Sequence, residues 1–408
     1  MPNLPELLAF VALTLLTYSA FTPTRRSNHD VISQPDSKPS LNDLPPELMS
    51  EVFRHLHDHE MTLRSCSLVC KSWVLLSRYH LFYRIHLNRA NVPAFVALLK
   101  SQSGSAIGAF VRQVTIHREL SHPPWMKETL PVLSSYLHPT SLYLNIHNAL
   151  HHNYVMFESE GFPTFKEDLS VFRDVFQDTT WLSLSLDCDT FAEGIHVVCA
   201  FPLLQTLELR GDWFHGRQSY VPSDMPCLPA GVRSIACFQG GSSFFLWLLR
   251  QPHPPFLSSL SLRDTYVTET IRSYLQTLGG TLQHLSFEPM PNQSIGSSDI
   301  DILHNAGLRS IAIHSQVDVI SLAFQLLSQA RSSDIEEVVI ELNEHGSSLD
   351  LPDLGPTQLW SRLDMLLSTS RFNKLRKLTV TIPWCPIHEI GKNLLPISNA
   401  RGVLRVLS

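Results

Sequence analysis

The sequence predicts an α/β fold, in which a small N-terminal helical unit precedes a solenoid of parallel strands and helices. Three observations support this prediction. A short strand-like pattern recurs through most of the 408-residue chain, helix-like stretches separate its copies, and an amphipathic stretch at 41–56 comes before the first copy. One strand and one helix repeated at a steady period are typical of solenoids.

The recurring pattern has the form apolar-x-x-apolar-x-apolar, and this alternation is typical of a strand. Its clearest copies lie at 110–117, 202–212, 255–264, 281–288, 307–314, 334–343 and 374–381, with looser copies at 140–146, 181–187 and 231–237. The middle apolar residues of six consecutive copies, from Leu207 to Val338, are 28, 25, 25, 26 and 27 positions apart. Longer intervals, from Leu142 to Leu184 and from Val338 to Leu378, indicate insertions in the same array.

Helix-like stretches lie between these copies, with the clearest at 241–251, 268–278, 317–330 and 356–370. Because a helix follows each strand, neighbouring strands are expected to run parallel. One strand and one helix in about 26 residues resemble the leucine-rich repeat. The resemblance covers roughly residues 108–408, and it implies a horseshoe with strands on its concave side and helices on its convex side.

The stretch 41–56 predicts an amphipathic helix. Asp43 can cap its start, Pro45 and Pro46 suit a first turn whose N–H groups lack partners, and Glu47 complements the helix dipole. Its apolar residues recur to form one broad face: Leu44, Leu48, Met49, Val52, Phe53 and Leu56. A second helix is predicted at 62–78. So small a unit cannot bury this surface alone, and we expect the apolar stripe to dock onto another protein.

Both helices together resemble an F-box. The family pattern begins Leu-Pro-x-Glu-Leu, continues through an apolar helix and ends Val-Cys-x-x-Trp. The matching residues are Leu44, Pro45, Glu47, Leu48, Val52, Phe53, Leu56, Leu63, Leu68, Val69, Cys70, Lys71 and Trp73. The resemblance assigns an F-box to residues 41–88. It implies that these residues bind the SKP-type adaptor of a cullin–RING ubiquitin ligase.

The first 40 residues carry a different signal. An uncharged, mostly apolar run at 7–21 is shorter than the roughly 20 residues that a bilayer span needs. It fits a signal peptide, a membrane anchor, an apolar helix or a misplaced start, and the sequence leaves these alternatives open. Residues 22–40 are polar and rich in proline, which predicts a disordered linker.

Composition limits the compartment and the partners. The net charge is −6, so no basic surface is available for nucleic acid. The seven cysteines form no C-x-x-C pair, which argues against a disulfide framework and against a structural zinc site. Free thiols fit a reducing compartment, the cytoplasm or nucleus. Membrane association through 7–21 is the alternative.

No catalytic motif is present, whether G-x-S-x-G, H-E-x-x-H, a P-loop or the Rossmann glycines. We therefore expect no enzyme, no catalytic residue and no cofactor. His55, His57 and His59 could in principle hold a metal ion. Their side chains would diverge and no cysteine or carboxylate completes a ligand set, so we expect a solvated loop and no metal.

Alternation along the repeat strands predicts the binding surface. If Leu207 and Leu209 face the core, then Thr206, Glu208 and Arg210 face outward. The same alternation exposes Thr115, His117, Tyr143, Asn145, Ser261, Arg263, Ser286, Glu288, Ala312, His314, Val339, Glu341, Thr379 and Thr381. We assign the substrate surface to Glu208, Arg210, Arg263, Glu288, His314 and Glu341. An acidic group (Glu336, Glu337 and Glu341) beside Arg376 and Lys377 fits either partner contact or interstrand charge pairs.

The combined resemblance implies the substrate-recognition subunit of an SCF-type ubiquitin ligase. The F-box would hold the SKP-type adaptor, and the repeats would hold an unidentified protein substrate. Two alternatives stay open at this point: an F-box scaffold outside any ligase, and a membrane-anchored or secreted interaction protein of the repeat type.

Overall fold

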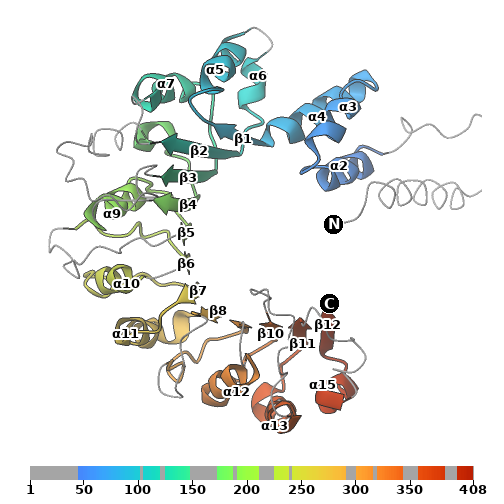
Figure 1. Ribbon diagram of the computed structural model, residues 1–408, viewed down its shortest axis with the longest axis vertical. Coiled ribbons are helices and arrows are strands. Elements are labelled where there is room, and N and C mark those ends of the chain that lie inside the picture. Colours follow the sequence, from blue (N-terminus) through green and yellow to red (C-terminus); the bar gives the residue numbers. More distant parts are fainter. Residues whose placement is uncertain are drawn as a thin grey trace, which may run out of the picture. The chain divides into compact units, whose positions relative to one another are not determined.

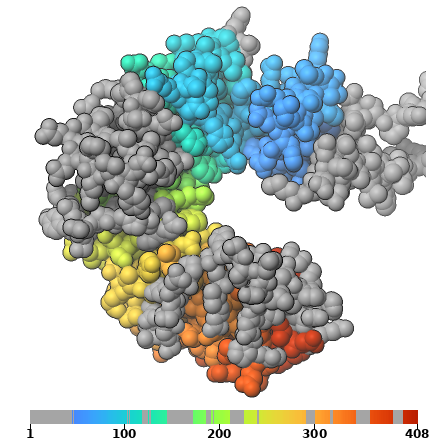
Figure 2. Space-filling view, viewed as in Figure 1, coloured from blue at the N-terminus to red at the C-terminus, as the bar shows by residue number. Residues whose placement is uncertain are grey.

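The structure is a computed structural model of the chain, and it describes residues 45–101, 104–119, 125–147, 172–186, 191–210, 225–238, 241–290, 300–315, 319–342, 357–381 and 393–407. The chain divides into two compact units, Met1–Leu81 and Phe82–Ser408. Figure 1 labels their elements, and Figure 2 gives the same view as space-filling atoms. The N-terminal segment 1–40 and the predicted adaptor-binding residue Leu44 lie outside the described residues.

Three helices build the described part of the first unit: α2 (Pro46–His55), α3 (Glu60–Cys66) and α4 (Lys71–Tyr83), the last of which continues into the second unit. The proline pair opens α2 as predicted. Pro45 precedes the helix with φ −54° and ψ 142°, and Pro46 is its first residue. Glu47 lies in the first turn, where its charge favours the helix dipole. Asp43, the expected cap, lies outside the described residues.

The prediction of a single helix at 62–78 is wrong, because a turn separates α3 from α4. The turn is tight, since the amides of Leu68 and Val69 donate to the carbonyls three residues earlier, at 3.0 and 3.1 Å. Ser67 contributes to the break, because its hydroxyl donates to the Arg64 carbonyl at 2.6 Å. Serine often competes in this way for the backbone groups that a helix needs.

The second unit is built on a 12-stranded sheet in which strand order follows chain order. Every pair of neighbouring strands is parallel, as the sequence predicts. The strands are β1 (Arg84–Leu87), β2 (Gln113–Glu119), β3 (Ser141–His147), β4 (Trp181–Leu186), β5 (Thr206–Arg210), β6 (Ser234–Phe238), β7 (Ser259–Thr265), β8 (His284–Pro289), β9 (Ser310–Ser315), β10 (Glu337–Leu342), β11 (Lys377–Thr381) and β12 (Leu404–Leu407).

A row of buried aliphatic residues sets the register of this sheet. Leu207 pairs with Ile235, and the same row continues through Leu260, Leu285, Ile311 and Val338. The long intervals obey the same rule, because Leu142 pairs with Leu182 and Val338 with Leu378. These aliphatic side chains are buried. Register is therefore specified by the buried row rather than by the length of chain between strands.

Helices cover one face of the sheet (Figure 1). The α-helices are α5 (Val92–Lys100), α6 (Ser105–Gly108), α7 (Trp125–Leu133), α9 (Phe191–Cys199), α10 (Ser242–Leu249), α11 (Glu269–Leu278), α12 (Val319–Gln329), α13 (Thr357–Leu367) and α15 (Pro396–Ala400), with short 3₁₀ turns η3 (Gly279–Thr281) and η4 (Ser370–Phe372). Their apolar side chains and the inward strand residues form one hydrophobic core. The opposite face carries Glu208 and Arg210. None of the described helices covers it, and it is called the helix-free face below.

The sheet begins earlier and ends later than the predicted strand copies. β1 starts at Arg84, before the predicted boundary at residue 108, and pairs with β2. β12, at the other edge, pairs with β11. Both strands have only four residues. A four-residue strand holds too few positions for alternation to be recognised from sequence, and pairing with a longer neighbour stabilises it here.

Candidate functional site

The helical unit has a small core of its own. Met49, Phe53, Leu56 and Leu63 are buried together, and Trp73 from α4 packs against them. The ring of Trp73 meets Phe53 edge to face, with centroids 5.5 Å apart and planes at 89°. Such aromatic pairs add stability beyond the burial of their surface. This cluster fixes the positions of α2, α3 and α4 relative to one another.

Several predicted docking residues lie in that core. Phe53 is 1% exposed, and Leu56 and Leu63 are also buried. The expectation that so small a unit cannot bury its apolar stripe is therefore wrong for Phe53 and Leu56, and their assignment to adaptor binding stays a prediction. The stripe is wide enough to cover α3 and α4 within the unit, so its centre is internal and only its margin reaches solvent.

Several apolar side chains of the helical unit are exposed. Leu48 is 38% exposed, and Leu68 and Val69, in the turn between α3 and α4, are 86% and 61% exposed. Met61 and Leu75 are exposed as well. Of the other predicted docking residues, Glu47 is exposed, and Pro45, Val52, Cys70 and Trp73 are partly buried. A concentration of exposed large apolar side chains on so small a unit is typical of an interaction surface.

Two histidines meet within the helical unit. The Nδ1 atoms of His57 and His80 lie 3.3 Å apart, and His80 stacks on Phe53 with ring centroids 6.3 Å apart. Burial, and then the neighbouring His57, lower the pKa of His80. His55 lies 3.3 Å from the Glu51 carboxylate instead. Within the described ranges, no group of three or more His, Cys, Asp or Glu side chains could hold a metal ion.

The helix-free face carries a row of charged and aromatic side chains across β5 to β10. Phe238 pairs with Arg263, and His314 pairs with Glu341. Arg210 and Glu288 lie in the same row. Each directly follows a paired residue, because Leu209 pairs with Cys237 and Phe287 pairs with Ile313. We call the following residues the charged row: Arg210, Phe238, Arg263, Glu288, His314 and Glu341. All of them except Phe238 belong to the predicted substrate surface. The remaining residue of that predicted surface, Glu208, lies two residues before Arg210 on the same strand.

Local contacts organise the charged row. Glu208 binds Arg210, with its Oε1 2.6 Å from Nη2. The guanidinium carbons of Arg210 and Arg263 each lie 5.3 Å from the centroid of the Phe238 ring. At the other end, Nδ1 of His314 lies 2.9 Å from the Glu341 carboxylate.

The row is less exposed than alternation predicts. Arg210 keeps 55% of its side-chain surface exposed and Glu341 keeps 37%. Glu288 and His314, predicted to be exposed, are buried. Thr115 and Thr379 are also buried, against prediction. Neighbouring strands stand only about 4.8 Å apart, so adjacent side chains on the same face of the sheet cover one another.

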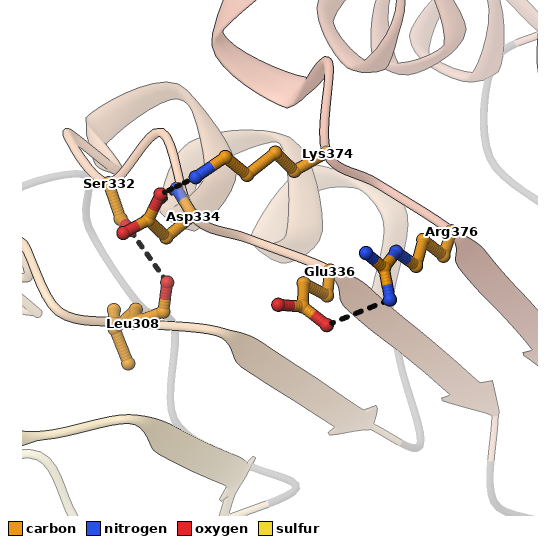
Figure 3. Close-up of polar contacts among 6 residues, drawn as sticks. All are labelled: Leu308, Ser332, Asp334, Glu336, Lys374 and Arg376. Carbon is orange, nitrogen blue, oxygen red and sulfur yellow. Dashed lines mark hydrogen bonds and ion pairs between the residues drawn. The ribbon is translucent and has the colours of Figure 1, made fainter.

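The acidic group proposed from sequence consists of interstrand charge pairs. Glu336 lies 3.9 Å from Arg376, and Glu337 lies 2.5 Å from Lys377. Figure 3 shows the first of these pairs beside the contact of Asp334 with Lys374, at 2.5 Å. In the same view Ser332 donates to the Leu308 carbonyl at 2.6 Å. These carboxylates already have partners within the protein, so the group offers little unpaired charge to another molecule.

Comparison with known proteins identifies the helical unit. Residues 41–88, which contain α2, α3, α4 and β1, match the F-box-like family. This stretch is an F-box-like domain. No curated protein matches the chain. Among solved structures, the leucine-rich repeat-containing protein LegL7 from Legionella pneumophila is similar at 16% sequence identity and a TM-score of 0.42, over 72% of this chain and 89% of that one.

The chain thus combines an F-box-like domain with a leucine-rich-repeat-like α/β solenoid, as the sequence predicts. Of the helices that the structure describes, none has the length and apolar character that a membrane crossing needs.

Sequence reasoning missed part of the exposed surface of the F-box-like domain. Met61 and Leu75 were not among the predicted docking residues, yet both are exposed. The only signal for Leu75 is the continuous run Val74–Leu76, in which a helix can turn only some members toward a core. The domain can therefore offer apolar contacts from three helices and a turn.

Proposed function

We propose that the protein is the substrate-recognition subunit of an SCF-type ubiquitin ligase. The observation that carries the proposal is the F-box-like domain with its exposed apolar residues, joined in one chain to a 12-stranded solenoid. F-box domains generally bind SKP-type adaptors. The solenoid provides a long sheet face on which the described residues form no helix, and such a face suits contact with a second protein. One chain can therefore link an adaptor to a substrate.

In this role the protein itself forms and breaks no bond. It raises the local concentration of a substrate near the ubiquitin-transfer machinery, and holding reactants in proximity can supply a large part of a rate enhancement. Free cysteines, among them Cys66, Cys199 and Cys237, fit a reducing compartment. We accordingly propose action in the cytoplasm or nucleus.

Adaptor docking is proposed to bury the exposed residues rather than the internal stripe. Complete burial of a leucine or valine side chain contributes about 1.5–3 kcal/mol. Leu48, Leu68 and Val69 combine exposure with positions that match the F-box pattern. Leu44 and Pro45 remain part of the proposed surface on the sequence pattern alone.

The test is co-purification of the full chain with an SKP-type adaptor. Changing Leu68→Ala together with Val69→Ala is expected to weaken adaptor binding at least about tenfold, since a tenfold change corresponds to about 1.4 kcal/mol. Both side chains are exposed, so the fold should survive. The matched control changes Leu203→Ala and Phe256→Ala, two exposed apolar residues of the second unit. Equal adaptor binding by all three proteins would contradict the proposal.

Ligase function and simple scaffolding differ in their product. Reconstitution of the chain with adaptor, cullin and RING subunits should yield ubiquitinated forms of the proteins that co-purify with the solenoid. The double variant should yield none. An assembled complex that modifies no co-purifying protein would instead support a scaffold.

A further inference from the structure

Three neighbouring strands bring two arginines to one phenyl ring. Arg210 on β5, Phe238 on β6 and Arg263 on β7 form what we call the Arg–Phe–Arg cluster. Each guanidinium carbon is 5.3 Å from the Phe238 centroid, so the two carbons are at most twice that distance apart. A cation over an aromatic face is stabilised by the ring quadrupole. The ring therefore holds two positive groups close together on the helix-free face.

The two arginines differ in what they bind. Arg210 contacts Glu208 twice, with Nε donating at 2.7 Å and Nη2 lying 2.6 Å from the same carboxylate oxygen. Arg263 has no comparable carboxylate partner in the described part of the chain. Its Nε is buried and has no hydrogen-bond partner among those residues. An unsatisfied buried donor destabilises a protein, and a planar guanidinium matches a carboxylate through two parallel hydrogen bonds.

The backbone at Arg263 is irregular. The register between β7 and β8 shifts between Leu262 and Thr265. Asp264, directly after Arg263, is the one described non-glycine residue with positive φ, at 47°. Extra residues of this kind bend a strand and change the direction of nearby side chains, and they are common beside binding sites. The irregularity thus falls at the arginine whose donor lacks an acceptor.

We infer that the Arg–Phe–Arg cluster receives the carboxylate of an aspartate or glutamate in an extended segment of a partner protein. Arg263 would bind the carboxylate, Phe238 would provide the apolar floor, and Arg210 would add positive charge while it stays paired with Glu208. The inference rests on the proposed function only in assigning that segment to a ligase substrate.

Glu341, at the other end of the charged row, predicts how this segment is oriented across the strands. Glu341 on β10 is three strands from Arg263 on β7, or roughly 14 Å at about 4.8 Å per strand. An extended chain covers that span in about four residues. Glu341 is partly exposed although it contacts His314. A segment that crosses the strands is therefore expected to place a lysine or arginine near Glu341, about four positions from its acidic residue.

In the experiment, random 12-residue peptides are displayed and selected for binding to the full chain. The expected result is enrichment of an acidic residue with a basic residue about four positions away. The best peptide should bind Arg263→Gln at least tenfold more weakly, and its own Glu→Gln form should lose the same affinity for the unchanged protein. Arg331→Gln, which removes an exposed arginine from the loop after α12, is the matched control and should bind the peptide normally.

Three outcomes would overturn the inference. Selected peptides could lack acidic residues, or Arg263→Gln could bind them with unchanged affinity. A peptide that binds only with phosphoserine in place of its acidic residue would assign the cluster to a phosphorylated partner. Melting temperatures establish that each variant is folded. If Arg263→Gln unfolds, Phe238→Leu takes its place and is expected to weaken binding.

Adaptor co-purification separates this inference from the proposed function. Arg263→Gln should retain the adaptor while it loses the peptide. A protein that binds acidic peptides through Arg263 but never binds an SKP-type adaptor would contradict the ligase proposal and leave the carboxylate site standing.

Discussion

His80 is a nearly buried base next to a second base, and this makes the F-box-like domain sensitive to acid. Burial and the neighbouring His57 lower the pKa of His80 in the folded protein, whereas the unfolded chain takes up its proton near the ordinary histidine value of about 6.5. Between these two pKa values the unfolded state binds more protons than the folded state. Stability therefore rises with pH in this range and is lost as the pH falls below about 6.5.

We expect the F-box-like domain, measured within the full chain, to unfold at a lower temperature at pH 5.5 than at pH 7.5. His80→Gln should show a smaller difference between the two conditions, because the glutamine does not titrate. Circular dichroism melts at both pH values test this. His253→Gln, an exposed histidine in the second unit, should keep the full difference. An unchanged pH dependence in His80→Gln would show that another group is responsible.

Which apolar residues of the F-box-like domain are internal could not be predicted from periodicity. The spacing of Leu48, Val52, Phe53 and Leu56 defines a face of α2, but only the positions of α3 and α4 decide which part is covered. The same limit applies to Glu288 and His314, where alternation gave the correct face but not the burial by neighbouring strands.

At the scale of elements, one helix cap is supplied from another helix. The carboxylate of Asp364 on α13 accepts hydrogen bonds from the amides of Ile397 and Ser398 at 2.7 and 2.9 Å, and from the Ser398 hydroxyl at 2.6 Å. These amides begin α15, which has no side-chain cap of its own. Because Asp364 is buried, water cannot replace it.

Asp364→Ala is expected to lower the free energy of unfolding of the second unit by about 2 kcal/mol, since it leaves two helix-start amides without an acceptor. Asp364→Asn keeps one carbonyl acceptor and should lose less than the alanine variant. Urea unfolding of the full chain measures both. Equal losses in the two variants would mean that packing, rather than capping, accounts for the effect.

The order of elements was predictable to a large degree, and the exceptions have physical causes. Ten strands and their parallel order follow from buried rows such as Leu260 and Leu285, because repetition multiplies a weak local signal. β1 and β12 have four residues each, and pairing with a neighbour, rather than their own pattern, stabilises them. The turn at Ser67–Cys70 was missed because the apolar spacing on both sides fits one continuous helix.

At the scale of the whole molecule, the two units have separate hydrophobic cores. One contains Phe53 and Leu63, and the other extends from Ile85 to Leu395. The described residues of the two cores form separate clusters, so we expect the effects of substitutions in the two cores on stability to be nearly additive.

Leu260→Ala is expected to destabilise the solenoid by about 2–5 kcal/mol, because the leucine is fully buried in its core. Adaptor co-purification at a temperature well below unfolding should stay unchanged.

Phe53→Ala should show the reverse pattern. It is expected to lower the free energy of unfolding of the helical unit by about 3–5 kcal/mol, to remove adaptor binding and to leave the unfolding transition of the solenoid unchanged. Calorimetry combined with the adaptor assay tests both. A single shared transition that moves equally in the two variants would contradict independent cores.

The register of the sheet also bears on how such a chain can change. Strands that are 40 residues apart, at Leu142 and Leu182 and again at Val338 and Leu378, pair as regularly as strands that are 25 apart. Entropy of loop closure grows only slowly with length, so extra chain between strands is tolerated. New sequence can therefore enter between repeats without disturbing the sheet. The surface can therefore change in sequence while the sheet is kept. These two intervals are suitable points for inserting a reporter or a designed binding loop.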